Sequence, residues 1–167
     1  SGDIKYEKSW LFDAATVRFP KADTLVIEST YGGPQDFQPN RVDATHEIQD
    51  LVKLAVSRSG KIFCPVFAVG RSQEVMLAID QLFKSGDVTP ITVWLDGMIS
   101  EATAIHASHP DYLNRDLRKQ VLRGGEENPF NSPWFKQVDS REQRESILND
   151  PSPCIVLATS GMMTGGP

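Results

Sequence analysis

From Thr24 onward the chain alternates short apolar runs with longer stretches in which apolar residues recur every three or four positions. The short runs predict strands at 25–27, 61–66, 91–95 and 154–159. The longer stretches predict helices at 42–57, 71–85, 100–107, 110–123 and 140–148. Strands and helices in this alternation are typical of the α/β class, with a mostly parallel sheet flanked by helices.

Composition narrows the class of protein further. A chain of 167 residues with 40% hydrophobic content is long enough to bury a core, and a net charge of −5 excludes a generally basic nucleic-acid coat but not a local basic groove. Cys64 and Cys154 lie inside strand-like runs without a CxxC pair, so we expect no disulfide framework and a cytoplasmic location. No run approaches the roughly 20 apolar residues of a membrane span. Because the chain stops in a glycine-rich loop at Gly166-Pro167, we expect a fragment of a longer protein.

Three strand ends carry candidate chemistry. Glu28 follows a strand-like run and precedes a turn, which places one carboxylate at a strand tip; a turn or helix cap is the alternative reading. Arg71 and the amides of residues 70–72 lie where a strand leads into a helix, a position that attracts phosphate. A structural salt bridge from Arg71 to Glu74 or to a neighbouring strand end is an equally good reading. Ser160 and Gly161 repeat the arrangement after the last strand, where glycine allows close approach of a phosphate.

Five blocks in this order resemble the β-CASP branch of the metallo-β-lactamase superfamily, and most of all its archaeal ribonucleases similar to the cleavage and polyadenylation specificity factor. The resemblance extends over nearly the whole chain. The blocks are Gly2-Asp3-Ile4-Lys5-Tyr6, Ile27-Glu28-Ser29-Thr30-Tyr31-Gly32, Pro65-Val66-Phe67-Ala68-Val69-Gly70-Arg71-Ser72-Gln73-Glu74, Asn128-Pro129-Phe130 and Ala158-Thr159-Ser160-Gly161-Met162-Met163.

The resemblance implies a division into domains and a set of roles. Residues 1–30 would be a remnant of a metallo-β-lactamase domain with short strands, 31–152 the β-CASP domain, and 153–167 a strand and loop that return to the first domain. Asp3 matches the aspartate that bridges two zinc ions, and Glu28 matches an acid that orients a catalytic histidine. Arg71, Ser160 and Gly161 would contact RNA. The implied function is a zinc-dependent ribonuclease that acts in RNA 3′-end processing or mRNA cleavage, with RNA and the remaining metallo-β-lactamase domain as partners and a homodimer of the full-length protein left open.

The family's HxHxDH zinc motif and its later histidine motifs are absent from the sequence. His46, His106 and His109 form no metal-ligand cluster, so we assign them no chemistry. We therefore expect the chain alone to hold no catalytic zinc and to cleave nothing. A catalytically inert RNA-binding or scaffold module remains the alternative. A doubly wound nucleotide-binding domain is disfavoured, since no GxGxxG follows a first strand.

Overall fold

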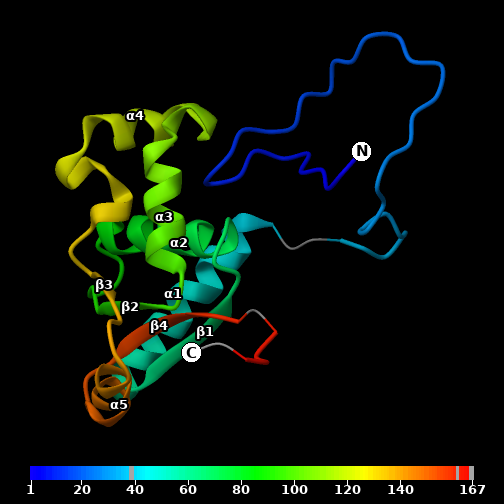
Figure 1. The fold of residues 1–167 in the computed structure, drawn as a ribbon. Helices are drawn as coiled ribbons and strands as arrows, with labels where there is room; N and C mark the ends of the chain where they lie inside the picture. The colour runs from blue at the N-terminus through cyan, green and yellow to red at the C-terminus, as the bar shows by residue number, and fades with distance from the viewer. Residues whose placement is uncertain (38–39, 161, 166–167) are drawn as a thin grey trace.

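Four parallel strands form one sheet in the order β1-β4-β2-β3 (Figure 1). The computed structural model describes residues 1–37, 40–160 and 162–165. The parallel sheet and the α/β class predicted from the sequence are confirmed. The strands are β1 (Lys61–Val66), β2 (Thr92–Asp96), β3 (Phe135–Gln137) and β4 (Cys154–Thr159).

Five α-helices connect and cover these strands. The helix predicted at 110–123 is wrong as a single element, because the side chain of Asn114 accepts hydrogen bonds from Asp116 N and Leu117 N and so starts a new helix there. Across the described ranges, no helix has both the length and the apolar character needed to cross a membrane. The elements are α1 (Arg41–Arg58), α2 (Arg71–Ser85), α3 (Ile99–Ser108), α4 (Arg115–Arg123) and α5 (Arg141–Asn149), with short 3-10 segments η1 (Pro110–Tyr112), η2 (Gly125–Glu127) and η3 (Pro129–Asn131).

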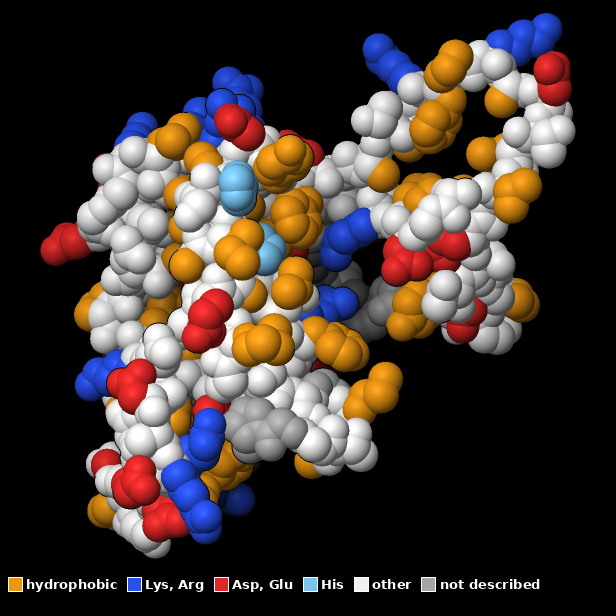
Figure 2. Space-filling view, in the orientation of Figure 1, with side chains coloured by type: hydrophobic (Ala, Val, Ile, Leu, Met, Phe, Trp, Pro, Cys, Tyr) orange, Lys and Arg blue, Asp and Glu red, His pale blue; other side chains and the backbone are white. Residues whose placement is uncertain are grey.

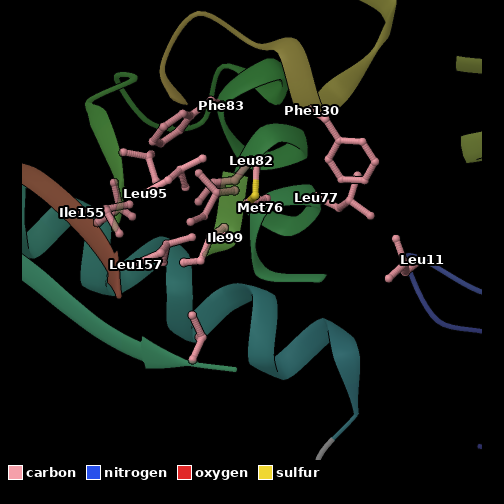
Figure 3. Packing of buried hydrophobic residues seen from close by; sticks show 14 of the residues in the cluster. Leu11, Met76, Leu77, Leu82, Phe83, Leu95, Ile99, Phe130, Ile155 and Leu157 are labelled. Atoms are coloured by element: carbon pink, nitrogen blue, oxygen red, sulfur yellow. The ribbon is translucent and has the colours of Figure 1, made fainter. Parts of the chain in front are cut away.

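The two faces of the sheet carry separate apolar cores, because neighbouring residues of a strand point to opposite sides. Ile155 and Leu157 of β4 pack with Met76, Leu82 and Ile99 of α2 and α3, whose side chains point into the same interior in Figure 3. On the other face, Cys154 and Val156 of β4 pack against Ile147 of α5. β4 therefore lies inside this sheet, between β1 and β2. The division into two domains at residue 153 stays a prediction.

The strand predicted at 25–27 is wrong. Residues 1–37, all of them described, form neither helix nor strand, and most of them lie apart from the sheet as an open loop (Figure 1). Leu25 and Val26 are exposed. A strand needs a neighbouring strand to which its backbone groups can form hydrogen bonds. Here the contacts are isolated ones, such as the hydrogen bond that the terminal amine of Ser1 donates to Val26 O. The short strands expected in residues 1–30 are therefore not formed.

Residues 9–12 fasten this N-terminal segment to the helices. Leu11 is fully buried, and its backbone amide donates to Glu74 Oε1 at 3.0 Å. Trp10 N donates to the other oxygen of Glu74 at 3.1 Å. The side chain of Asn114 donates to Trp10 O at 2.7 Å, and its backbone amide donates to Leu11 O. One turn of chain is thus held between α2 and the start of α4.

Candidate functional site

The carboxyl ends of β1, β4 and β2 meet at one edge of the sheet. Val66 lies opposite Thr159 in the register of β1 and β4, and Asp96 lies opposite Ala158 in that of β2 and β4. The loops that follow these strands surround a hollow of about 450 Å³ that includes Phe67 and Ser160. In open parallel sheets, ligands bind at this edge where the strand order reverses. Here the hollow lies at the carboxyl ends of β1 and β4, and β4 lies between β1 and β2.

Close packing at the end of β2 requires glycine. Gly97 has a φ of 78°, a conformation that L side chains rarely adopt. A Cβ atom added at this residue would lie 1.9 Å from Thr159 Oγ1. The loop after β2 and the last residue of β4 are therefore in direct contact at the floor of the site.

A fully buried glutamine holds the loop 67–70 after β1. Gln73 Oε1 accepts a hydrogen bond from Gly70 N at 2.7 Å. Its Nε2 donates to Ala68 O at 3.1 Å and to Thr103 Oγ1 of α3 at 2.9 Å. All of these polar atoms have partners, so Gln73 can be buried without an unsatisfied group. The sequence analysis missed this role, although a glutamine three residues after a helix-starting glycine is a capping signal.

The backbone amides at the start of α2 do not form the expected phosphate site. Gly70 N donates to Gln73, Arg71 N to Val69 O and Ser72 N to Phe67 O, so each already has a partner inside the loop. That part of the prediction is wrong, because local hydrogen bonds of the turn satisfy the donors that a free helix end would offer.

The side chain of Arg71 is exposed, and no ion pair to it is formed within the part of the chain that the structure describes. The salt bridge to Glu74 is wrong, since the Glu74 carboxylate binds the amides of Trp10 and Leu11 instead. The structure therefore leaves Arg71, three residues after Ala68 of the hollow, as an exposed cation without an ion pair among the described residues.

Ser160 lines the hollow, but its polar groups are partly used within its own turn. Ser160 Oγ donates to Thr164 O at 3.1 Å, and Ser160 O accepts from Met163 N at 2.8 Å. Ser160 N donates to Val66 O at 3.4 Å, which joins the ends of β4 and β1. Gly161 lies outside the described residues.

Asp3 and Glu28 come from segments that contact each other. Ile4 N donates to Glu28 Oε1 at 3.3 Å, and Glu28 N donates to Ser1 Oγ at 3.0 Å. The amide of Thr30 donates to Glu28 Oε2 at 2.9 Å. This bond, then the Thr30 side chain and then the Ile4 amide lower the pKa of the Glu28 carboxyl below its ordinary value of 4.5. Asp3 is exposed and Glu28 is partly buried, and both lie on the open N-terminal loop rather than at the tips of strands. In this structure Glu28 caps a turn.

The residues present do not fit a pair of zinc ions. Within the described ranges, no group of three or more His, Cys, Asp or Glu side chains is placed to hold a metal ion. Asp3 alone offers one carboxylate, whereas zinc sites in proteins use three or four protein ligands. No step of a reaction can be assigned to zinc on these residues.

A second cluster of side chains was missed by the sequence analysis. His106 and His109, to which we assigned no chemistry, lie with Phe12 and Tyr112 around a hollow of about 490 Å³. The spacing of three between His106, His109 and Tyr112 was the available signal. The contribution of Phe12 was not predictable, because it comes from the distant N-terminal segment.

Comparison with known proteins agrees with the fold. The Beta-Casp domain model matches residues 72–167. The chain is 52% identical over its whole length to the transcription termination factor FttA of Methanosarcina mazei and 46% identical to that of Methanocaldococcus jannaschii. It spans about a quarter of the length of these relatives, 26% in each case. Since the family model covers more than half of the chain, including β2, β3, β4 and nearly all of α2, the chain belongs to the Beta-Casp domain family.

Proposed function

We propose that this chain forms one wall of an RNA-binding groove in a transcription termination factor, and that Arg71 contacts the RNA backbone there. The relatives that match the full length of this chain are named transcription termination factor. A termination factor acts where RNA is being made, so RNA is the polyanion that the groove would meet.

One observation carries the proposal: Arg71 is exposed and has no ion pair among the described residues. It is the first residue of α2 and follows by three positions Ala68, which lines the hollow at the carboxyl ends of the parallel strands. Unpaired guanidinium groups bind phosphate oxygens in pairs of hydrogen bonds. Gln73 fixes the loop just before Arg71, so the backbone that carries this side chain loses little freedom on binding.

For the whole protein we propose ribonuclease activity, which the sequence resemblance supports. The catalytic step would need ligands and proton donors from outside the described residues, since these hold no metal-binding group of three. The contribution of this chain is to bind and orient the RNA strand. Ser160 and Asp3 remain candidates for contacts in the assembled site.

The test replaces Arg71 with alanine and measures the affinity for single-stranded RNA over a range of salt concentrations. We expect weaker binding and a salt slope reduced by about 0.7, the value for one lost phosphate contact on a single strand. Arg58→Ala is the matched control, because Arg58 is exposed in the last turn of α1, at the opposite end of β1. Equal slopes for Arg71→Ala and the unchanged protein would contradict the proposal.

The second candidate is a catalytically inert RNA-binding or scaffold module, in which the same Arg71 contact binds RNA without cleavage. The full-length protein distinguishes the two. Cleavage of RNA that stops after treatment with a chelator supports the ribonuclease. Intact RNA, with binding that still depends on Arg71, supports the inert module.

A further inference from the structure

Loop 67–70 separates two hollows on the surface of the protein. Phe67 lines the hollow described above, whereas Val69 lines the second one, together with Phe12, His106, His109 and Tyr112. We call these four ring-bearing residues, 12, 106, 109 and 112, the ring cluster. Because both hollows share one loop as a wall, a chain-like ligand that contacts Arg71 can reach the ring cluster.

The ring cluster is held in place by the backbone around it. The centroids of the Phe12 and His106 rings are 6.1 Å apart, and those of His109 and Tyr112 are 6.5 Å apart. Phe12 N donates to Ser9 Oγ at 2.8 Å inside the anchored turn. His106 Nδ1 lies 2.7 Å from Ala102 O, and a carbonyl oxygen only accepts, so Nδ1 carries the proton. The rings therefore form a preorganised surface.

His109 and Tyr112 are exposed, whereas Phe12 and His106 are partly buried. Tyr112 is 78% exposed, and its neighbours Val69 and Ile105 are 69% and 62% exposed. Figure 2 shows hydrophobic side chains gathered around the two histidines, with both basic and acidic side chains at the border of the patch. Contiguous exposed apolar surface of this kind marks a binding site.

The charges around the ring cluster select the ligand. No acidic residue lines its hollow. Arg71 follows Val69 by two residues and Arg115 follows Tyr112 by three, and neither has an ion pair among the described contacts. Flat rings beside unpaired cations match a ligand with flat faces and negative charges, which describes a single-stranded nucleic acid better than an apolar protein surface.

We propose that the ring cluster stacks on a base of single-stranded RNA whose backbone passes Arg71. This inference rests on the proposed function, but it names a different site with a different interaction. The affinity from phosphate contacts does not depend on the bases, whereas the affinity from stacking is lost when the base is removed.

The experiment uses an oligoadenylate of about ten nucleotides with one central 2-aminopurine, a length within the range that single-strand binding sites cover. Affinity is read from anisotropy, and stacking from quenching of the 2-aminopurine fluorescence. Tyr112→Leu keeps an apolar side chain but removes the ring, so we expect binding about five- to 150-fold weaker and loss of quenching. Tyr112→Phe keeps the ring and should bind like the unchanged protein. Leu122→Ala is the control, since Leu122 is an exposed apolar residue on α4.

An oligonucleotide of equal length without bases separates the two proposals. Tighter binding of the base-bearing strand supports stacking. Equal binding of both strands overturns the ring cluster as a base site and leaves the Arg71 contact standing. Binding of neither strand overturns both proposals. If Tyr112→Leu instead abolishes a self-association of the protein measured by sedimentation, a second copy occupies this face and the stacking proposal is wrong.

Discussion

Arg144 of α5 binds Asp96 at the end of β2 through two hydrogen bonds. Arg144 Nε donates to Asp96 Oδ2 at 2.7 Å, and Arg144 Nη2 donates to Asp96 Oδ1 at 2.8 Å. The bond to Asp96 raises the pKa of the Arg144 guanidinium. Asp96 is buried and also accepts from Gly97 N at 2.8 Å. This pair ties the helix on one face of the sheet to the floor of the candidate site.

We expect Asp96→Asn to lower the free energy of unfolding by about 1.5–3 kcal/mol, since a neutral amide cannot replace a buried carboxylate in charge-assisted hydrogen bonds. Urea unfolding measures the change. In a double-mutant cycle with Arg144→Met, the combined loss should be smaller than the sum of the two single losses, because both variants remove the same interaction. Additive losses would show that the two side chains do not stabilise one another.

The second prediction concerns Gly97, where the cost of a side-chain clash can be measured separately from the cost of the left-handed backbone. Gly97 and Gly86 have φ values of 78° and 81°, but only Gly97 has an atom close to the site of a Cβ, Thr159 Oγ1. We expect Gly86→Ala to cost about 1–2 kcal/mol for the left-handed backbone alone. Gly97→Ala should cost at least about 1 kcal/mol more, since overpacking adds to the strain. Equal losses in urea unfolding would contradict the contact.

The fold was largely predictable from periodicity, because the strands and helices after residue 40 carry their apolar residues at positions that a buried sheet face or helix stripe dictates. β3 was not predicted, since three residues, Phe135–Gln137, give too short a pattern. The predicted strand at 25–27 shows the opposite failure. Its apolar residues satisfy the pattern for a strand, but a ladder depends on a partner that local sequence does not reveal.

The candidate site was predictable only in part. The strand-loop-helix pattern placed Arg71 at the edge of the sheet, but it could not show that the neighbouring amides bond within the loop. The role of Glu74 depends on residues more than 60 positions away, Trp10 and Leu11, so no local pattern indicates it. Contacts between distant segments decide which polar groups remain available for a ligand.

Glu74 should control the attachment of the N-terminal segment. Glu74→Ala removes the acceptor of two backbone amides, which leaves Trp10 N and Leu11 N without these bonds. We expect faster hydrogen exchange of both amides, measured by NMR, while the exchange of the β4 amides stays unchanged. Glu47→Ala is the control, because Glu47 is an exposed acidic residue on α1. Unchanged exchange at residues 10 and 11 would show that the burial of Leu11 and the hydrogen bonds from Asn114 hold the segment without Glu74.

The contact that Glu28 makes between the two segments of the N-terminal loop should depend on pH. Hydrogen bonds from Thr30 N and Ile4 N lower the pKa of Glu28, so the carboxylate favours the contact fully above its ordinary value of 4.5. As the pH falls through the lowered pKa of the folded form, protonation removes this contribution. The amide shifts of Ile4 and Thr30, followed by NMR, should therefore titrate together with a midpoint below 4.5. Glu28→Gln should abolish this titration, and a midpoint at or above the ordinary value would show that the carboxylate does not hold the two segments together.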